Sequence, residues 1–349
     1  MQTRRTALKL LGAGLIASPA VISSARAQGL DSVTLGIPGS VSDGSFFAAI
    51  HKGYFKDQGI NIVPAAFQAG SQLVAPLGAG QVDAAAGATS AGLYNAVARG
   101  IDIKIAADKS SNMPGYCYMA LLVRQDHVDS GRYKSFEDLK GFRVAEAGKA
   151  GAPGSTLNEA MKKGGLKYDD ATHVYNMPYP DMAAALQNKA IDAAIVTEPS
   201  STRARKMGVA VRIPSDLFYP IQNVAPLLCS GKFLKERKEV AQRFMIAYLK
   251  GVRFYNDACK DGRLAGPNAE ELIQMMVTSS EVKDPQIYRE ATPNGVDPNG
   301  RLNMDSLNKD LAFYKEMKLV AAEVKVEDAL DTSFMEAAVK ALGPYVPAK

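Results

Sequence analysis

Residues 76–89 have the sequence PLGAGQVDAAAGAT, and residues 185–198 have the sequence ALQNKAIDAAIVTE. The two segments share a tripeptide that begins at Asp83 in the first and at Asp192 in the second, and the offset of 192 − 83 = 109 residues also matches flanking apolar positions. In both segments an apolar helical pattern ends, a polar turn follows, and a short apolar strand begins. A helix–turn–strand unit that recurs at a fixed offset predicts two similar α/β lobes.

Short strands and helices alternate along the rest of the chain, which is typical of sheets with helices on both faces. Strands are predicted in the first lobe at 33–38, 60–67, 82–86 and 101–106, and in the second lobe at 142–145, 173–176, 191–196 and 209–213. Two antiparallel strands, 118–123 and 224–228, are predicted to join the lobes, and the segment 108–115 before them is predicted to be a loop. Long helices are expected to pack on the first lobe, at 236–256, 269–278 and 304–317.

The first 27 residues have the features of an export signal. Arg4 and Arg5 precede an apolar stretch, and Ala25-Arg26-Ala27 is a typical cleavage site. The apolar stretch is shorter than the roughly 20 residues that a membrane span needs. The paired arginines are similar to a twin-arginine signal, although Ala7 stands where that signal usually has Phe. The sequence therefore predicts a periplasmic protein, exported by the twin-arginine or the ordinary secretion route.

Most of the net positive charge belongs to this leader. The full chain has 41 basic and 36 acidic residues, and the leader contains Arg4, Arg5, Lys9 and Arg26, so 41 − 4 = 37 basic residues remain against 36 acidic ones. A net charge near +1 gives no support for nucleic-acid binding. The remaining chain is long enough for two domains, because single cores rarely exceed about 250–300 residues.

Catalytic and metal-binding patterns are absent from the sequence. The histidines His51, His127 and His173 are far apart and lack metal-ligand spacing. No GxSxG elbow occurs, and the glycine-rich loop 148–154 does not match the phosphate-binding pattern GxxxxGK[ST]. We therefore expect no enzyme activity, no cofactor and no metal.

The three cysteines are too few for a disulfide framework, and buried thiols are the simplest interpretation. Cys117 and Cys229 flank the two predicted joining strands, so a bond between this one pair stays open.

Small polar residues stand where predicted strands end and helices begin. The first turn of a helix has unpaired N–H groups and the positive end of the helix dipole, and ligands of open α/β sheets lie at these strand ends. The candidate ligand-binding residues are Gly39, Ser40 and Ser42, then Gly70, Ser71 and Gln72, then Thr89 and Ser90, and finally Gly154, Ser155 and Thr156 at the start of a helix predicted for 155–163. Phe46 is a candidate for an apolar wall. Each hydroxyl taken singly also fits helix capping.

Glu198 follows the strand of the second repeat. It fits a helix-start acid that the dipole stabilises, and it equally fits a cleft acid that accepts a ligand donor or holds the lobes together.

Two further segments carry a family resemblance. Residues 51–60, HKGYFKDQGI, follow the first strand, and residues 136–141, FEDLKG, precede the second lobe. Together with the leader and the repeat, they make residues 31–250 resemble the periplasmic solute-binding proteins of ABC importers. The most similar branch is the nitrate/sulfonate/taurine-type family, which includes binders of thiamine pyrimidine precursors and of aromatic acids. Phe142 replaces the Lys that is common after the second motif.

The resemblance implies a type II periplasmic-binding-protein fold that closes on one small molecule. The domains would be a signal peptide at 1–27, a first lobe at 28–119 plus 226–349, and a second lobe at 120–225. It adds Thr197 beside Glu198 as a second-lobe contact. It also implies a monomer that delivers its ligand to an ABC permease with a cytoplasmic ATPase.

The expected ligand is a small organic anion, a sulfonate or a carboxylate, aromatic ones included. Two other functions remain open from the sequence. A pyrimidine-synthesising family of thiamine biosynthesis shares the fold, but those enzymes are cytoplasmic and carry clustered cysteines, which disfavours them here. A periplasmic ligand sensor for a membrane kinase is the other alternative.

Overall fold

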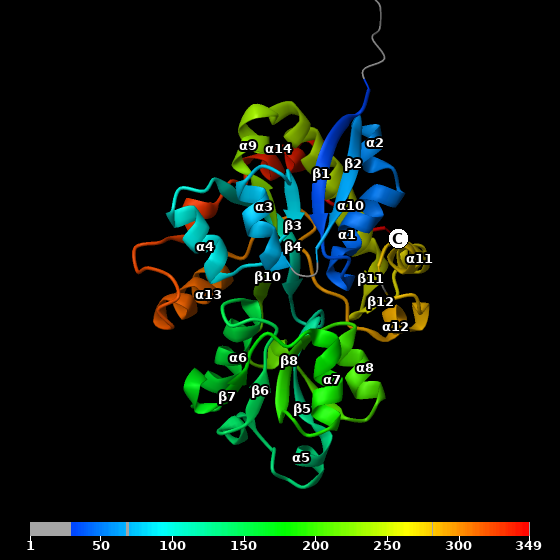
Figure 1. Cartoon of the computed structure of the whole chain (residues 1–349). Helices are drawn as coiled ribbons and strands as arrows, with labels where there is room; N and C mark the ends of the chain where they lie inside the picture. Colours follow the sequence, from blue (N-terminus) through cyan, green and yellow to red (C-terminus); the bar gives the residue numbers. More distant parts are fainter. Residues whose placement is uncertain (1–28, 68–69, 281, 349) are drawn as a thin grey trace, which may run out of the picture.

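The computed structural model describes residues 29–67, 70–280 and 282–348, so the predicted leader lies outside the described part (Figure 1). Two five-stranded sheets form two lobes. The first sheet contains β1 (Asp31–Ile37), β2 (Ile60–Ala66), β3 (Ala84–Ala86), β4 (Ile103–Asn112) and β10 (Gln222–Ser230). The second contains β5 (Met119–Arg124), β6 (Arg143–Ala145), β7 (Thr172–Val174), β8 (Ala193–Thr197) and β9 (Ala210–Pro214). The predicted two-lobed α/β architecture is confirmed.

Helices flank both sheets. Those of the first lobe and the C-terminal region are α1 (Gly44–His51), α2 (Tyr54–Asp57), α3 (Val74–Gly78), α4 (Ala91–Ala98), α9 (Gly231–Glu236), α10 (Lys238–Ala258), α11 (Ala269–Ser279), α12 (Pro285–Glu290), α13 (Met304–Glu316) and α14 (Ser333–Leu342). The second lobe has α5 (Gln125–Asp129), α6 (Ala152–Lys163), α7 (Tyr179–Gln187) and α8 (Ser200–Lys206). A small two-stranded sheet, β11 (Cys259–Lys260) and β12 (Arg263–Leu264), follows α10.

The long helix α10 packs one apolar face on the first lobe, where Phe244, Tyr248 and Val252 belong to the core. Its contact with α1 depends on Gly251, because a Cβ at this position would lie 2.3 Å from the Ser45 carbonyl oxygen. A larger residue would separate the two helices.

The two sheets have the same strand order, β2-β1-β3-β10-β4 and β7-β6-β8-β5-β9. Their register is also the same. Leu35 of β1 pairs with Ala84 of β3, and Val144 of β6 pairs with Ala193 of β8, so both partners are displaced by the 109 residues of the sequence repeat. The internal repeat is therefore a repeat of sheet geometry.

Each sheet also contains one antiparallel strand, β10 in the first and β5 in the second. The predicted joining strands lie in these two different sheets, so they do not pair with each other, and short segments at 113–118 and 215–221 connect the lobes instead. The predicted loop 108–115 is wrong over its first half, because β4 continues to Asn112 by pairing with β10. Cys117, Cys229 and Cys259 are free thiols.

The repeated aspartates explain the common register. Asp83 Oδ2 accepts a hydrogen bond from the Thr34 N–H at 2.9 Å, and the Asp83 N–H donates to the Thr34 carbonyl at 3.0 Å. Asp192 forms the same two bonds with Arg143, at 3.0 Å and 2.8 Å. Asp83 thus fixes the start of β3 against β1, and Asp192 fixes the start of β8 against β6.

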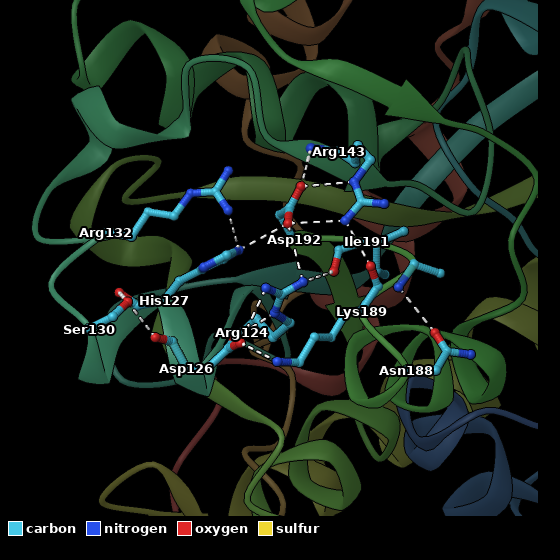
Figure 2. A network of polar contacts seen from close by, with 11 residues as sticks. Arg124, Asp126, His127, Ser130, Arg132, Arg143, Asn188, Lys189, Ile191 and Asp192 are labelled. Carbon is cyan, nitrogen blue, oxygen red and sulfur yellow. Dashed lines mark hydrogen bonds and ion pairs between the residues drawn. The ribbon is translucent and has the colours of Figure 1, made fainter.

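In the second lobe the aspartate is also the centre of a charged network (Figure 2). Asp192 is buried and contacts Arg143 at 3.0 Å, His127 at 2.9 Å and Arg124 at 3.3 Å. Burial by itself raises the pKa of the Asp192 carboxyl, but the bonds from Arg143 and His127 outweigh it and hold this pKa well below its usual range. Asp126, which also contacts Arg124, is far more exposed.

Asp192→Asn is expected to lower the free energy of unfolding at neutral pH by about 3 kcal/mol, because it removes the buried carboxylate that Arg143, Arg124 and His127 share. The depressed pKa means that the stabilisation is complete above the unfolded value near pH 4 and is lost as the pH falls below it. Urea unfolding between about pH 5 and about pH 3 should therefore show a weaker pH dependence in the variant than in the wild type. Asp126→Asn is the control and should cost less than about 1 kcal/mol. Equal losses in both variants would contradict the role of Asp192.

Candidate functional site

A cavity of about 470 Å³ lies between the lobes. Residues that follow β1, β3, β6 and β8 line it, so it occupies the carboxyl ends of the parallel strands of both sheets. Figure 1 shows these strand ends facing the boundary between the lobes.

Several of the sequence-predicted residues lie on the wall of this cavity. Those from the first lobe are Ser40, Ser42, Thr89 and Ser90, and those from the second are Thr197 and Glu198. The structure therefore brings together predicted residues that lie up to 158 positions apart in the sequence.

Other predicted residues are placed differently. Gly39 stands next to the wall in a turn that needs its positive φ of 74°. Phe46 is buried in the first-lobe core, where its ring centroid lies 4.7 Å from that of Tyr248. Gly70, Ser71 and Gln72 begin a 3-10 helix, but the side-chain positions at 70 and 71 are outside the described part, so their contribution stays a prediction.

Gly154, Ser155 and Thr156 lie in the body of α6, because this helix begins at Ala152 and not at Ser155. Pro153 favours the earlier start, since proline suits the first turn of a helix. Ser155 Oγ donates to Asp310 of α13, and Thr156 Oγ1 contacts Gln222 Oε1 at 2.7 Å. A Cβ on Gly154 would lie 3.0 Å from Glu146 Oε2. These bonds place both hydroxyls in a buried contact with α13 and β10, while α6 presents its N-terminal residues to the cavity.

Sequence reasoning missed two parts of the wall. The glycine-rich loop and the residue before it contribute Ala147, Gly148, Ala150 and Gly151, whereas only Gly154 of this loop was predicted to bind the ligand. Lys109 also lines the cavity, from the part of β4 that was predicted to be a loop. A lysine inside a strand that is otherwise buried was the signal that could have identified it.

Lys109 is almost fully buried and is held by the first loop. Its Nζ lies 2.8 Å from Asp43 Oδ1 and 2.9 Å from Ser42 Oγ. Ser42 Oγ in turn lies 2.8 Å from Ser40 Oγ, which donates to Asp43 Oδ2 at 3.2 Å. If Ser42 donates to Ser40, both hydroxyl protons are used within the loop, and Lys109 is the side chain there with a proton left for a ligand.

Two helix N-termini reach the wall, one from each lobe. Ser90 caps α4 by accepting from the Leu93 N–H at 3.2 Å, and the Ala91 N–H donates to the Ala150 carbonyl of the opposite lobe at 2.9 Å. The next N–H of α4, on Gly92, has no acceptor among the residues the structure describes. The same holds for the N–H groups of residues 147–150, in the loop before α6, whereas an antiparallel bridge between Ser90 and Gly151 joins the start of α6 to the first lobe. The cavity therefore has unpaired N–H donors on both sides.

Glu198 is engaged with protein groups. Its Oε2 accepts from the Thr202 N–H at 3.1 Å, and its Oε1 lies 3.4 Å from Arg212 Nε and 3.5 Å from the Thr292 N–H. Thr292 follows α12, so this carboxylate joins the second lobe to the C-terminal region. The geometry supports the interpretation of Glu198 as both a helix-start acid and a contact between lobes.

Tyr118 and Tyr179 complete the wall as aromatic surfaces. Burial raises the pKa of both phenols, so they are neutral at physiological pH. Within residues 29–67, 70–280 and 282–348, no cluster of three potential metal ligands is present. Over the same residues, no helix has the length and apolar character that a bilayer crossing requires.

The comparisons with known proteins agree with this geometry. Residues 26–266 match the profile of the NMT1-like family. No curated protein sequence matches the chain.

Among solved structures, the chain is similar to the alkanesulfonate-binding protein SsuA from Xanthomonas axonopodis pv. citri bound to MOPS, with 18% identity, coverage of 86% of this chain and 98% of that chain, and a TM-score of 0.68. The periplasmic nitrate-binding protein NrtA from Synechocystis PCC 6803 has 13% identity, coverage of 90% and 89%, and a TM-score of 0.68. A DszB mutant in complex with biphenyl-2-sulfinic acid has 14% identity, coverage of 89% and 99%, and a TM-score of 0.63. These likenesses establish the fold of periplasmic binding proteins.

Asp310→Asn tests the buried contact between α6 and α13. Burial raises the pKa of Asp310 to about 6, above its unfolded value, so the stability that this group contributes is complete below about pH 4 and is lost as the pH rises through about 6. The variant has no such loss. Its free energy of unfolding relative to the wild type should therefore rise between about pH 4 and about pH 7, as measured by urea unfolding. A difference that is constant with pH would show that Asp310 titrates normally.

Proposed function

The chain belongs to the NMT1-like family, and we propose that it is a periplasmic solute-binding protein that captures a small organic anion between its lobes. The anion is a sulfonate or a carboxylate, aromatic ones included. The protein is exported by its leader, acts as a monomer, and delivers the ligand to an ABC permease with a cytoplasmic ATPase.

The convergence of hydrogen-bond donors on one cavity carries this proposal. The N-terminus of α4 supplies the Gly92 N–H, the loop before α6 supplies the N–H groups of residues 147–150, and β4 supplies Lys109. Unpaired N–H groups at helix N-termini bind anions because the partial positive charge of the helix dipole is concentrated there.

The rest of the wall suits an organic body. Tyr118, Tyr179, Met119 and Val224 offer apolar surface, and the volume of about 470 Å³ is within the usual range for organic ligands. The molecules named with two of the solved relatives, MOPS and biphenyl-2-sulfinic acid, combine an acidic sulfur group with a ring, which supports the same class.

Ligand capture would close the lobes. The donors come from both lobes, so an anion that contacts all of them stabilises the arrangement in which the lobes meet. The hydrogen bond from Ala91 to Ala150 already crosses this boundary at 2.9 Å. The proposal involves no chemical step, because Glu198, Ser40 and Ser42 are engaged in bonds with protein groups.

A thermal-unfolding screen of the purified protein tests the function. The panel contains benzenesulfonate, benzoate, ethanesulfonate, acetate, nitrate and neutral pyrimidines. A true ligand at 100 times its dissociation constant adds about 2.7 kcal/mol, which corresponds to a rise of about 5 °C in Tm. Stabilisation by the neutral pyrimidines alone, or by no member of the panel, would contradict the proposal.

Gly148→Leu tests whether the ligand binds in the cavity. A Cβ at Gly148 meets no atom within 4 Å, so the protein should fold normally, while the new side chain occupies space on the wall. The ligand-induced rise in Tm should fall by at least half. Gly29→Leu is the matched control, because a Cβ there is equally unobstructed and Gly29 is not a lining residue. Equal ligand-induced rises in Tm in the two variants would show that the ligand does not bind in this cavity.

A further inference from the structure

Lys109 has a donor that the protein does not use. An ammonium group has three N–H bonds, and Nζ has two acceptors, Asp43 Oδ1 at 2.8 Å and Ser42 Oγ at 2.9 Å. No third acceptor is found in the described part of the chain. Because Lys109 lines the cavity while its side chain is only 2% exposed, the remaining N–H is placed for an acceptor atom of the ligand.

The charge of this ammonium is nevertheless compensated. Asp43 has a side-chain exposure of 0% and is held by three donors, the Lys109 ammonium, the Ser40 N–H at 2.8 Å and the Ser40 hydroxyl. It stands behind the wall and does not line the cavity. The ligand therefore meets a donor from Lys109 without meeting an uncompensated positive charge.

Two other charged groups around the cavity also have partners. Glu198 lies 3.4 Å from Arg212. Glu146, next to the glycine-rich loop, lies 2.8 Å from His173 Nδ1, and the Nε2 of the same ring lies 3.0 Å from the Tyr168 carbonyl. Glu146 also accepts from the Tyr168 hydroxyl at 2.8 Å.

Three charged groups near the cavity have no ion-pair partner in the described part of the chain: Asp310 behind α6, the exposed Lys149 of the loop before α6, and Asp108. Asp108 stands next to Lys109 on β4, and its carboxylate binds Asn223, Ser111 and the Asp297 N–H instead of a cation. Asp108 does not line the cavity. Any charge on it adds negative potential and opposes a second negative charge on a ligand.

Apart from Lys149, which is exposed to solvent, the remaining positive potential comes from the two helix N-termini. Each is equivalent to roughly half an elementary charge, so α4 and α6 together balance about one negative charge. We propose that Asp43 is a specificity determinant: by neutralising Lys109, it sets the cavity to accept singly charged organic anions and to reject doubly charged ones. This inference rests on the proposed function and adds the charge state of the ligand.

Asp43→Asn tests the inference, because it should change the ratio of the affinities for monoanions and dianions. Pairs of probes with one ring and different charge are compared by calorimetric titration: benzoate with phthalate, and benzenesulfonate with 1,3-benzenedisulfonate. The wild type should bind the monoanion of a pair at least about tenfold more tightly than the dianion. In the variant the uncompensated Lys109 should shift this ratio toward the dianion by about tenfold or more.

Two further variants distinguish the effect of the Lys109 charge from structural disruption caused by the substitution itself. Asp43→Asn combined with Lys109→Gln removes both charges, so its affinities should fall while its monoanion-to-dianion ratio stays within about threefold of the wild type. Asp83→Asn is the matched control, because this carboxylate also pairs with a cation, Arg237 at 3.3 Å, but stands at the opposite end of β3. It should reduce stability without changing the ratio.

The outcomes distinguish the two proposals. No binding of any probe to the wild type would overturn the proposed function, and the charge inference with it. Equal binding of monoanions and dianions by the wild type, or an unchanged ratio in a folded Asp43→Asn protein, would overturn the charge inference alone. If Asp43→Asn does not fold, a ratio in the double variant that shifts toward dianions would also overturn it, because that variant has the wild-type net charge.

Discussion

The constraint on which the rest of the structure depends is the pair of hydrogen bonds by which one aspartate in each lobe holds a neighbouring strand, β1 or β6. Asp83 and Asp192 each exchange two hydrogen bonds with the residue 49 positions earlier, Thr34 or Arg143. These bonds fix β3 against β1 and β8 against β6, so the two strands of each pair end at the same level in their sheet. A one-residue slip would turn every side chain of β3 or β8 to the opposite face of its sheet.

The site follows from this register. Because the parallel strands end together, the loops that leave them and the helices α4 and α6 begin at one boundary, where each lobe presents unpaired N–H groups. A negative charge placed there contacts both lobes, which also meet through the bond from Ala91 to Ala150 and through the buried bonds of Ser155 and Thr156. Under the proposed function, the partial charges of the helix N-termini hold the anion, while Asp43 pairs with the Lys109 ammonium and limits the charge that the ligand can carry.

The boundary between the lobes also contains a second set of contacts, away from the cavity centre. Arg212 of β9 joins Glu198 at 3.4 Å and donates to the Cys117 carbonyl in one of the connecting segments. Glu198 also reaches the Thr292 N–H. These bonds link three parts of the chain: the end of β8, the connecting segment that contains Cys117, and the C-terminal region. The position of Glu198 on the wall therefore depends on how the lobes are placed relative to each other.

The sequence by itself determined the two-lobed α/β fold, because its 109-residue repeat carries the aspartates and apolar strands that form the same sheet twice. It also identified wall residues such as Ser90 and Glu198, since strand ends in parallel sheets meet at one edge. Only the tertiary structure decided that Lys109 faces the cavity and that Ser155 and Thr156 do not. Pairing with β10, a strand more than 100 residues away, extends β4 through Lys109, and packing on α13 engages the α6 hydroxyls. Such long-range contacts leave no local pattern in the chain.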